Sequence, residues 1–169
     1  MFAARPWVEV YTDTVELPDG RVREHFHRLV LPDFAVAVAL TPERRFVMVR
    51  EYKHGADAIC LNAPAGRLDD AEEPLAGARR ELLEETGYAA DAWQPLGNFF
   101  IDGSTRGARA HLFLARDARI VAEPQLDDTE EIEVVLLDEA QVREALASGA
   151  IALMPTACAL GLALASLGR

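Results

Sequence analysis

The sequence has few cysteines, few positive charges and few aromatic residues, and the first two shortages exclude classes of protein. Its 169 residues include only two cysteines, Cys60 and Cys158, too few for a disulfide framework and at no metal-ligand spacing. We expect both thiols to be reduced and buried. Lys and Arg number 17 against 28 Asp and Glu, giving a formal net charge of −11. That sign argues against non-specific nucleic-acid binding, which requires a cationic face.

A long hydrophobic run is missing as well. The first ten residues hold no apolar stretch of signal-peptide length. The segment between Glu144 and Arg169 carries no charge, but Ser, Gly, Pro and Thr interrupt it, whereas a membrane span needs about 20 strongly apolar residues. We therefore expect a docked C-terminal helix, no membrane association and a cytoplasmic location.

The remaining composition is that of one globular domain, because 50% of the residues are hydrophobic and 27% are charged. Apolar alternation and turn residues predict strands, and a 3.6-residue period predicts helices. The predicted strands cover residues 8–17, 22–31, 34–40, 46–52, 93–101, 110–115 and 132–137, and the helices cover 71–86, 138–147 and the C-terminal segment. Strands and helices do not alternate regularly, which favours an α/β domain with a mixed sheet.

Acidic residues gather in two short stretches, within 66–85 and 123–133. The ordinary interpretation of a charge run is a solvated face. In the first stretch, however, Glu81 and Glu85 are i,i+4 neighbours on a helix and Glu84 lies beside both, so the three carboxylates repel one another. A hard divalent cation such as Mg²⁺ or Mn²⁺ relieves that repulsion and also binds substrate phosphates. Arg80 can reach Glu84 and fix its geometry.

A longer signature includes these residues. Gly66, five residues, Glu72, seven residues and then Arg-Glu-Leu-Leu-Glu-Glu-Thr-Gly-Tyr from Arg80 to Tyr88 resembles the complete Nudix box, with every fixed position filled. The hairpin region, residues 50–53, 63–66, 111–115 and 130–134, and the C-terminal helix resemble the ADP-ribose pyrophosphatase branch. The resemblance implies a Nudix fold, with a mixed β-sheet between helices. It also implies that residues 1–33 form an antiparallel hairpin that builds a homodimer, while residues 34–169 form the catalytic core.

The resemblance further implies hydrolysis of ADP-ribose to AMP and ribose 5-phosphate with two or three Mg²⁺ or Mn²⁺ ions. The metal ligands that it implies are Glu81, Glu85, Glu130 and the Ala65 carbonyl. The other residues with implied catalytic roles are Arg80, which orients carboxylates, and Glu84. Glu72 corresponds to a structural carboxylate. Glu130 is also the best match for the general base, with Asp128 and Glu131 as the alternatives.

The substrate side departs from the branch. Its ADP-ribose hydrolases usually carry a proline about sixteen residues past the last glycine of the box, whereas residues 100–107 contain none. Another nucleoside diphosphate sugar, such as GDP-mannose, is therefore an alternative substrate, and ligand sensing without catalysis is an alternative function. The candidate substrate contacts are Arg28, Arg50, Tyr52 and Arg106. The other cationic or aromatic candidates, whose ordinary interpretation is exposure or core packing, are Trp7, Phe26, Phe34, Lys53, His54 and Arg109. His25 and His27 alternate on a strand but have no third ligand nearby for zinc.

Overall fold

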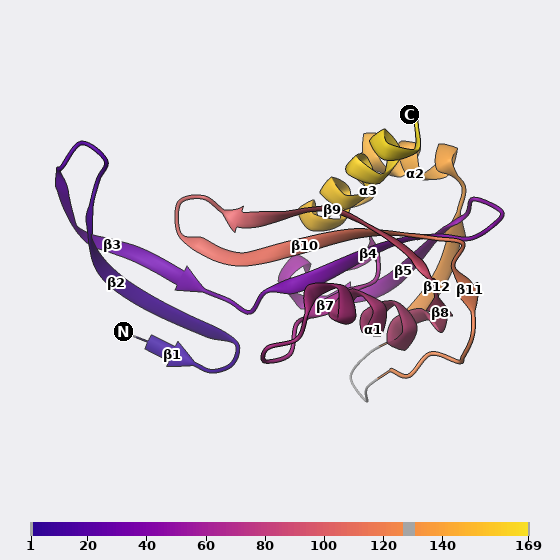
Figure 1. The fold of residues 1–169 in the computed structure, drawn as a ribbon, viewed down its shortest axis with the longest axis horizontal. Coiled ribbons are helices and arrows are strands. Elements are labelled where there is room, and N and C mark those ends of the chain that lie inside the picture. Colours follow the sequence, from indigo (N-terminus) through magenta and orange to yellow (C-terminus); the bar gives the residue numbers. More distant parts are fainter. Residues whose placement is uncertain (1, 127–130, 169) are drawn as a thin grey trace.

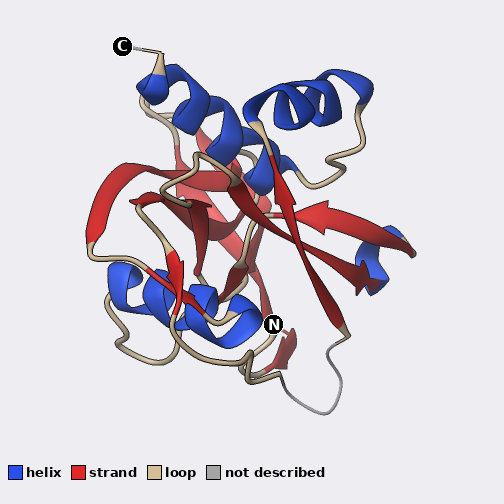
Figure 2. Cartoon of the chain, turned by 90° about the vertical axis from the view of Figure 1, so that its right-hand side faces the viewer, coloured by secondary structure: helices blue, strands red, loops and turns tan. Residues whose placement is uncertain are grey.

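The computed structural model describes residues 2–126 and 131–168. A mixed sheet lies between helices, with α1 on one side and α2 and α3 on the other (Figures 1 and 2). The elements in chain order are β1 (Phe2–Ala4), β2 (Val8–Glu16), β3 (Val22–Val30), β4 (Phe34–Leu40), β5 (Phe46–Lys53), the 3₁₀ helix η1 (His54–Ala56), β6 (Ala58–Asn62), β7 (Ala65–Arg67), α1 (Pro74–Thr86), β8 (Tyr88–Ala89), β9 (Ala92–Asp102), β10 (Arg106–Arg116), β11 (Arg119–Ile120), β12 (Ile132–Leu137), α2 (Glu139–Ser148) and α3 (Met154–Leu167). The α/β class and the mixed sheet predicted from the sequence are confirmed.

Strand β4 is the centre of the molecule, and its two faces enter two different cores. Val36, Val38 and Leu40 pack with α2 and α3, whereas the alternating alanines Ala35 to Ala39 pack under α1 with Leu82. This alternation follows from the two-residue period of a strand. Because the side chains beneath it are small, α1 lies close to the sheet.

Along one edge, the two halves of β4 pair with different strands. The candidate site lies where these strands separate. The main path runs β1-β2-β3-β10-β4-β5-β12, and β10 is parallel to β4. The first half of β4 pairs with β7 and its last two residues pair with β5. Strand β6 pairs antiparallel with the second half of β5. It leads through Ala63 and Pro64 into β7. The middle of β5, the end of β6 and the start of β7 therefore lie close together below α1.

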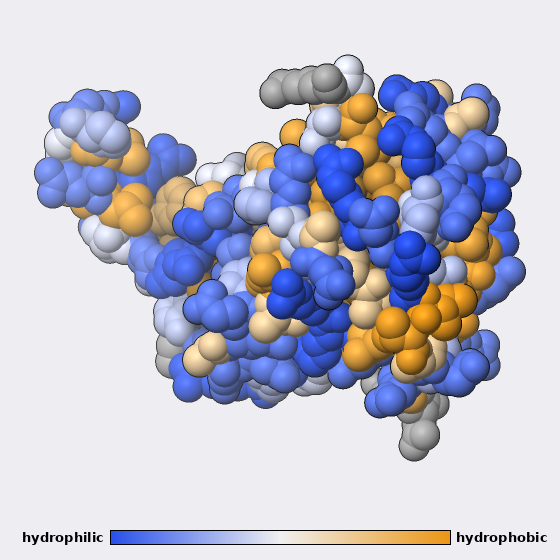
Figure 3. All heavy atoms as spheres, turned by 45° about the vertical axis from the view of Figure 1, so that its right-hand side comes forward, coloured by the Kyte–Doolittle hydropathy of each residue, from blue (hydrophilic) through white to orange (hydrophobic). Residues whose placement is uncertain are grey.

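The N-terminal hairpin extends from this body. Strands β2 and β3 pair antiparallel, and the end of β3 joins the sheet by pairing with the first residues of β10 (Figure 1). In Figure 3 the hairpin forms a separate lobe with both hydrophilic and hydrophobic side chains on its surface. Phe2, Trp7 and Val22 are each more than 60% exposed, so the hairpin buries little of its own apolar surface.

Element boundaries differ from the sequence prediction where turns decide them. Helix α1 begins at Pro74 rather than at residue 71, because Ala71 has a positive φ of 62° and proline suits the first turn of a helix. Strand β10 starts four residues earlier than predicted. Asp138 caps α2 through a capping box. The short strands β6 and β7 were not predicted. No helix among the described residues is long and apolar enough to cross a bilayer.

Candidate active site

Helix α1 carries most of the acidic site, and its packing fixes which side chains face the sheet. Ala78 and Leu82 are fully buried against β4. Gly87 ends the helix with a φ of 71°, a conformation that favours glycine. Because Ala78 and Leu82 turn this face of the helix toward the sheet, Glu85 also points inward and is only 4% exposed.

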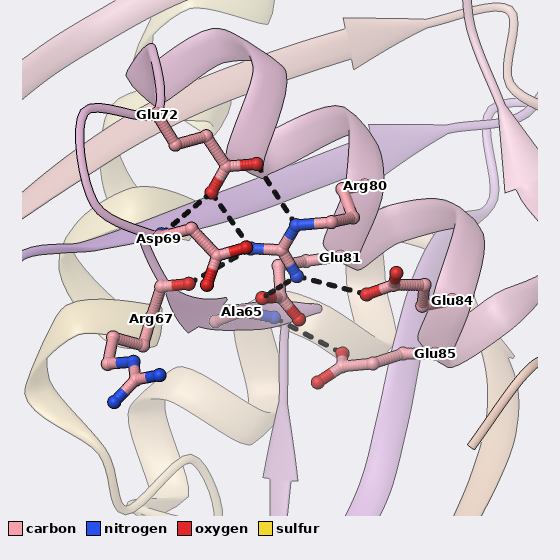
Figure 4. A network of polar contacts seen from close by, with 8 residues as sticks. All are labelled: Ala65, Arg67, Asp69, Glu72, Arg80, Glu81, Glu84 and Glu85. Carbon is pink, nitrogen blue, oxygen red and sulfur yellow. Dashed lines mark hydrogen bonds and ion pairs between the residues drawn. The ribbon is translucent and has the colours of Figure 1, made fainter. Parts of the chain in front are cut away.

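Arg80 is the hub of the polar network in Figure 4. Its Nε and Nη2 donate to the two carboxylate oxygens of Glu72, both at 3.0 Å. Nη1 donates to Glu81 at 2.7 Å and to Glu84 at 3.0 Å, and Nη2 also donates to the Arg67 carbonyl at 2.9 Å. The guanidinium thus uses all five of its N–H groups. Its contact with Glu84 is the one that the helical spacing predicted, and its pKa is raised, chiefly by the hydrogen bond with Glu72.

Two carboxylates of α1 meet strand β7. A Cβ atom on Gly66 would overlap the Glu81 carboxylate, so only glycine leaves room for that side chain. The Ala65 amide donates to Glu85 at 3.2 Å, as Figure 4 shows. The backbone of Ala65 and Gly66 therefore lies against both of the glutamates for which metal ligation was predicted.

The donor set fits a hard divalent cation. Burial, followed by the negative charges of Glu51 and Glu81, raises the pKa of Glu85 well above 4.5. A cation bound beside such a carboxyl group stabilises its ionised form. Carboxylate and backbone oxygens are the ligands that Mg²⁺ and Mn²⁺ prefer. Among the described residues no three His, Cys, Asp or Glu side chains already form a metal cage, and Arg80 is the present counter-ion of Glu81 and Glu84.

Glu51 and Asn62 lie next to the candidate site, and the sequence analysis did not name them. Asn62 donates to Glu51 at 3.1 Å, and Lys53 lies 2.6 Å from the same carboxylate. The signal was present in the strand alternation, because Glu51 and Lys53 continue the buried face of Val47 and Val49. Arg50 and Tyr52, which were chosen instead, alternate with them.

The predicted substrate contacts do not share one cavity, and Arg106 also lines one of about 700 Å³ beside Arg67 and Asp69. Arg28 and Arg106 line one of about 390 Å³ together with Phe26, Phe100 and Arg109. Within it Arg28 pairs with Asp13 at 2.6 Å, and Arg109 stacks on Phe100. This cavity lies between the hairpin and the β9–β10 turn, away from the Glu85 carboxylate.

Arg50 and Tyr52 line the second cavity, of about 440 Å³, with Glu51, Leu126 and Glu131. Arg50 forms an ion pair with Glu133 at 3.2 Å, and the Tyr52 hydroxyl donates to Asp57 at 2.9 Å. Glu131 thus reaches the same cavity as Glu51. Asp128 and Glu130, two of the three candidate bases, lie outside the described residues.

The remaining candidates take ordinary places. Trp7 lies under the Arg67 guanidinium, 4.7 Å from ring centroid to Cζ. Phe34 packs on the core of β4. His25 and His27 are exposed on β3.

Comparison with known proteins agrees with the geometry. The family model described as the NUDIX domain matches residues 31–156. An ADP-ribose pyrophosphatase of Bacillus subtilis (strain 168) is 34% identical over 130 residues, which cover 76% of this chain and 69% of that protein. A GDP-mannose pyrophosphatase of Cronobacter sakazakii is 29% identical over 79% of this chain and 74% of that protein. The crystal structure of an ADP compounds hydrolase superposes with a TM-score of 0.83 at 22% identity, covering 99% of this chain and 90% of the other.

Proposed function

This chain belongs to the Nudix family, and on that premise we propose that it hydrolyses the pyrophosphate bond of ADP-ribose to AMP and ribose 5-phosphate. The observation that carries the proposal is the meeting of Glu81 and Glu85 at Ala65 and Gly66, with Arg80 holding the neighbouring carboxylates. The family generally needs divalent metal ions, and we propose Mg²⁺ or Mn²⁺, two to three in each site.

The side chains divide the work of the reaction. Glu81, Glu85 and the Ala65 carbonyl would hold the cations, which when bound neutralise the pyrophosphate and activate the attacking water. Arg80 fixes Glu81 and Glu84 in place through charged hydrogen bonds. Burial of Glu85 keeps competing water away from the carboxylate. For the proton acceptor we keep Glu130, which the resemblance favours over Asp128 and Glu131.

We propose that Arg28 and Arg106 contact the nucleoside end of the substrate. We also propose that Arg50 and Tyr52 contact the substrate in the cavity that Glu51 lines. The two pairs line different cavities of one chain. A homodimer in which the hairpin of one protomer reaches its partner would bring such groups to one substrate. The exposed apolar residues of the hairpin support this assembly, and the free thiols fit a cytoplasmic location.

The test is a substrate panel at neutral pH with Mg²⁺ or Mn²⁺. ADP-ribose should give AMP and ribose 5-phosphate, detected by chromatography and by phosphate release after alkaline phosphatase. Omitting the metal should abolish the products, and replacing Glu85 with Gln should slow their formation at least about a hundredfold. Tight binding of ADP-ribose with no turnover under any metal condition would instead support ligand sensing.

GDP-mannose is the second candidate substrate. The turn at Asp102 to Gly107 lacks the proline typical of ADP-ribose hydrolases, and Asp102 closes it by accepting hydrogen bonds from Ser104 and Thr105. A relative of this chain is named a GDP-mannose pyrophosphatase. A kcat/KM for GDP-mannose at least about tenfold above that for ADP-ribose would favour this alternative.

A further inference from the structure

Glu51 reaches the acidic site from the sheet rather than from the helix. It lies on β5 with its side chain 11% exposed, two residues after the fully buried Val49. That alternation turns it to the face that α1 covers. Its hydrogen-bond partner Asn62 lies three residues before Ala65, whose amide donates to Glu85 at 3.2 Å, so a short segment joins Glu51 to the Glu85 end of the site.

Asn62 holds Glu51 and has an unsatisfied oxygen of its own. The residue is 2% exposed, and its Nδ2 donates to Glu51 at 3.1 Å. Its Oδ1 is buried and accepts no hydrogen bond within the described part of the chain. A buried carbonyl oxygen without a donor is costly, and a cation, or a water bound to one, would satisfy it. The oxygen belongs to a side chain already turned toward the acidic cluster.

The balance of charge around these groups also points to a cation. Three carboxylates, those of Glu51, Glu81 and Glu85, are mostly or fully buried. Arg80 already donates to Glu81, Glu84 and Glu72. Lys53 lies against Glu51 but is 36% exposed. The Glu85 end of the cluster is therefore the part where negative charge is least compensated.

We propose that Glu51 and Asn62 extend the metal site across the sheet, raising the affinity of the Glu81–Glu85 site for a divalent cation. Glu51 does so by its charge, and Asn62 by positioning Glu51 and presenting its Oδ1. The inference rests on the proposed metal-dependent function, but it concerns residues outside the Nudix box. Neither residue is placed against the pyrophosphate, so both act on the affinity for the cation.

The test measures Mn²⁺ binding directly, by calorimetry and by the electron spin resonance signal of free Mn²⁺, on the full chain without substrate. Glu51→Gln and Asn62→Ala should each weaken binding about tenfold or more, as expected for groups that support metal ligands. Lys53→Met should strengthen binding, because it removes a positive charge beside the same carboxylate. Glu139→Gln, an equal charge change on α2, is the matched control and should bind as the wild type does.

The outcomes separate this inference from the proposed function. If the wild type binds Mn²⁺ and Glu85→Gln does not, while Glu51→Gln and Asn62→Ala bind within twofold of the wild type, the inference is wrong and the proposed function stands. If the wild type neither binds Mn²⁺ nor hydrolyses any substrate, the proposed function itself fails. If Glu51→Gln does not fold, Lys53→Met still tests the proposal. Mn²⁺ binding by Lys53→Met that is unchanged or weaker than that of the wild type would contradict it.

Discussion

Arg80 shows how one residue organises the acidic site. Its planar guanidinium makes a two-point contact with Glu72 and also reaches Glu81, Glu84 and a backbone carbonyl. A lysine could not reproduce this geometry, because its ammonium group is a single point of charge. Arg80 thus holds together carboxylates that would otherwise repel one another.

Glu72→Gln should destabilise the protein by about 1.5–3 kcal/mol at pH 7, the range for losing a hydrogen bond with a charged group. The Arg80 guanidinium holds the pKa of Glu72 below its ordinary value of 4.5. Its stabilisation is therefore fully present above pH 4.5 and is lost as the pH falls through the folded pKa. Urea unfolding of the wild type and of Glu72→Gln should give a constant difference in the free energy of unfolding between pH 6 and 8. That difference should narrow below pH 4.5. A gap that widens in acid would contradict the role of this ion pair.

Glu85→Gln separates function from stability. Without metal the substitution should leave the free energy of unfolding unchanged or higher, because it removes a desolvated charge beside Glu51 and Glu81. The kcat should nevertheless fall at least about a hundredfold, since charge stabilisation by a metal supplies several kcal/mol. Urea unfolding in EDTA and steady-state kinetics in saturating Mg²⁺ measure the two effects. Turnover near that of the wild type would remove Glu85 from the metal site.

At the scale of elements, the sequence predicted those with a clear period and missed those set by tertiary pairing. Helix α1, its carboxylate spacing and β4 follow from local patterns. Strands β6 and β7 do not, because they are short and exist by pairing with β5 and β4. For the same reason the sequence pointed to Arg80 of α1, whereas Asn62 of β6, which donates to Glu51, gave no local signal.

The approach of α1 to β7 depends on Gly66. Gly66→Ala places a methyl group on the Glu81 carboxylate and must displace it. We expect kcat to fall at least about tenfold and the metal-dependent rise in Tm to shrink, with the fold retained. Gly161→Ala is the matched control, because a Cβ there meets nothing and α3 should become slightly more stable. If Gly66→Ala keeps the full metal-dependent Tm rise, the close contact has no role in holding metal.

The segment before β12 supplies the candidate base. Glu133 is fixed in β12 by its ion pair with Arg50, which leaves Asp128, Glu130 and Glu131. We predict that Glu130→Gln lowers kcat at least about tenfold more than Glu131→Gln or Asp128→Asn, within the range for losing acid–base catalysis. Steady-state kinetics of the three variants decide the question. A larger loss for Glu131→Gln, whose side chain lines the cavity of Glu51, would shift the assignment by one residue.

The whole molecule is a compact acidic body from which the N-terminal hairpin extends, and exposed apolar residues remain on the hairpin. Strong net charge keeps such proteins apart in solution unless a specific apolar surface joins them. The hairpin offers that surface through Phe2, Trp7 and Val22. An uncovered strand pair with exposed apolar residues is an aggregation hazard, so a two-fold partner is the expected cover.

Light scattering should therefore give a mass of twice 18.5 kDa at micromolar concentration. Val22→Asp and Trp7→Asp should each shift the protein toward the monomer, because each buries a charge in the proposed interface. A monomer should also have a raised KM, since the hairpin of one protomer is proposed to complete the nucleoside pocket of the other. Met154→Asp, on an equally exposed apolar residue of α3, is the control and should remain dimeric. A wild-type monomer with full activity would show that one chain suffices and would contradict the proposed role of the partner's hairpin.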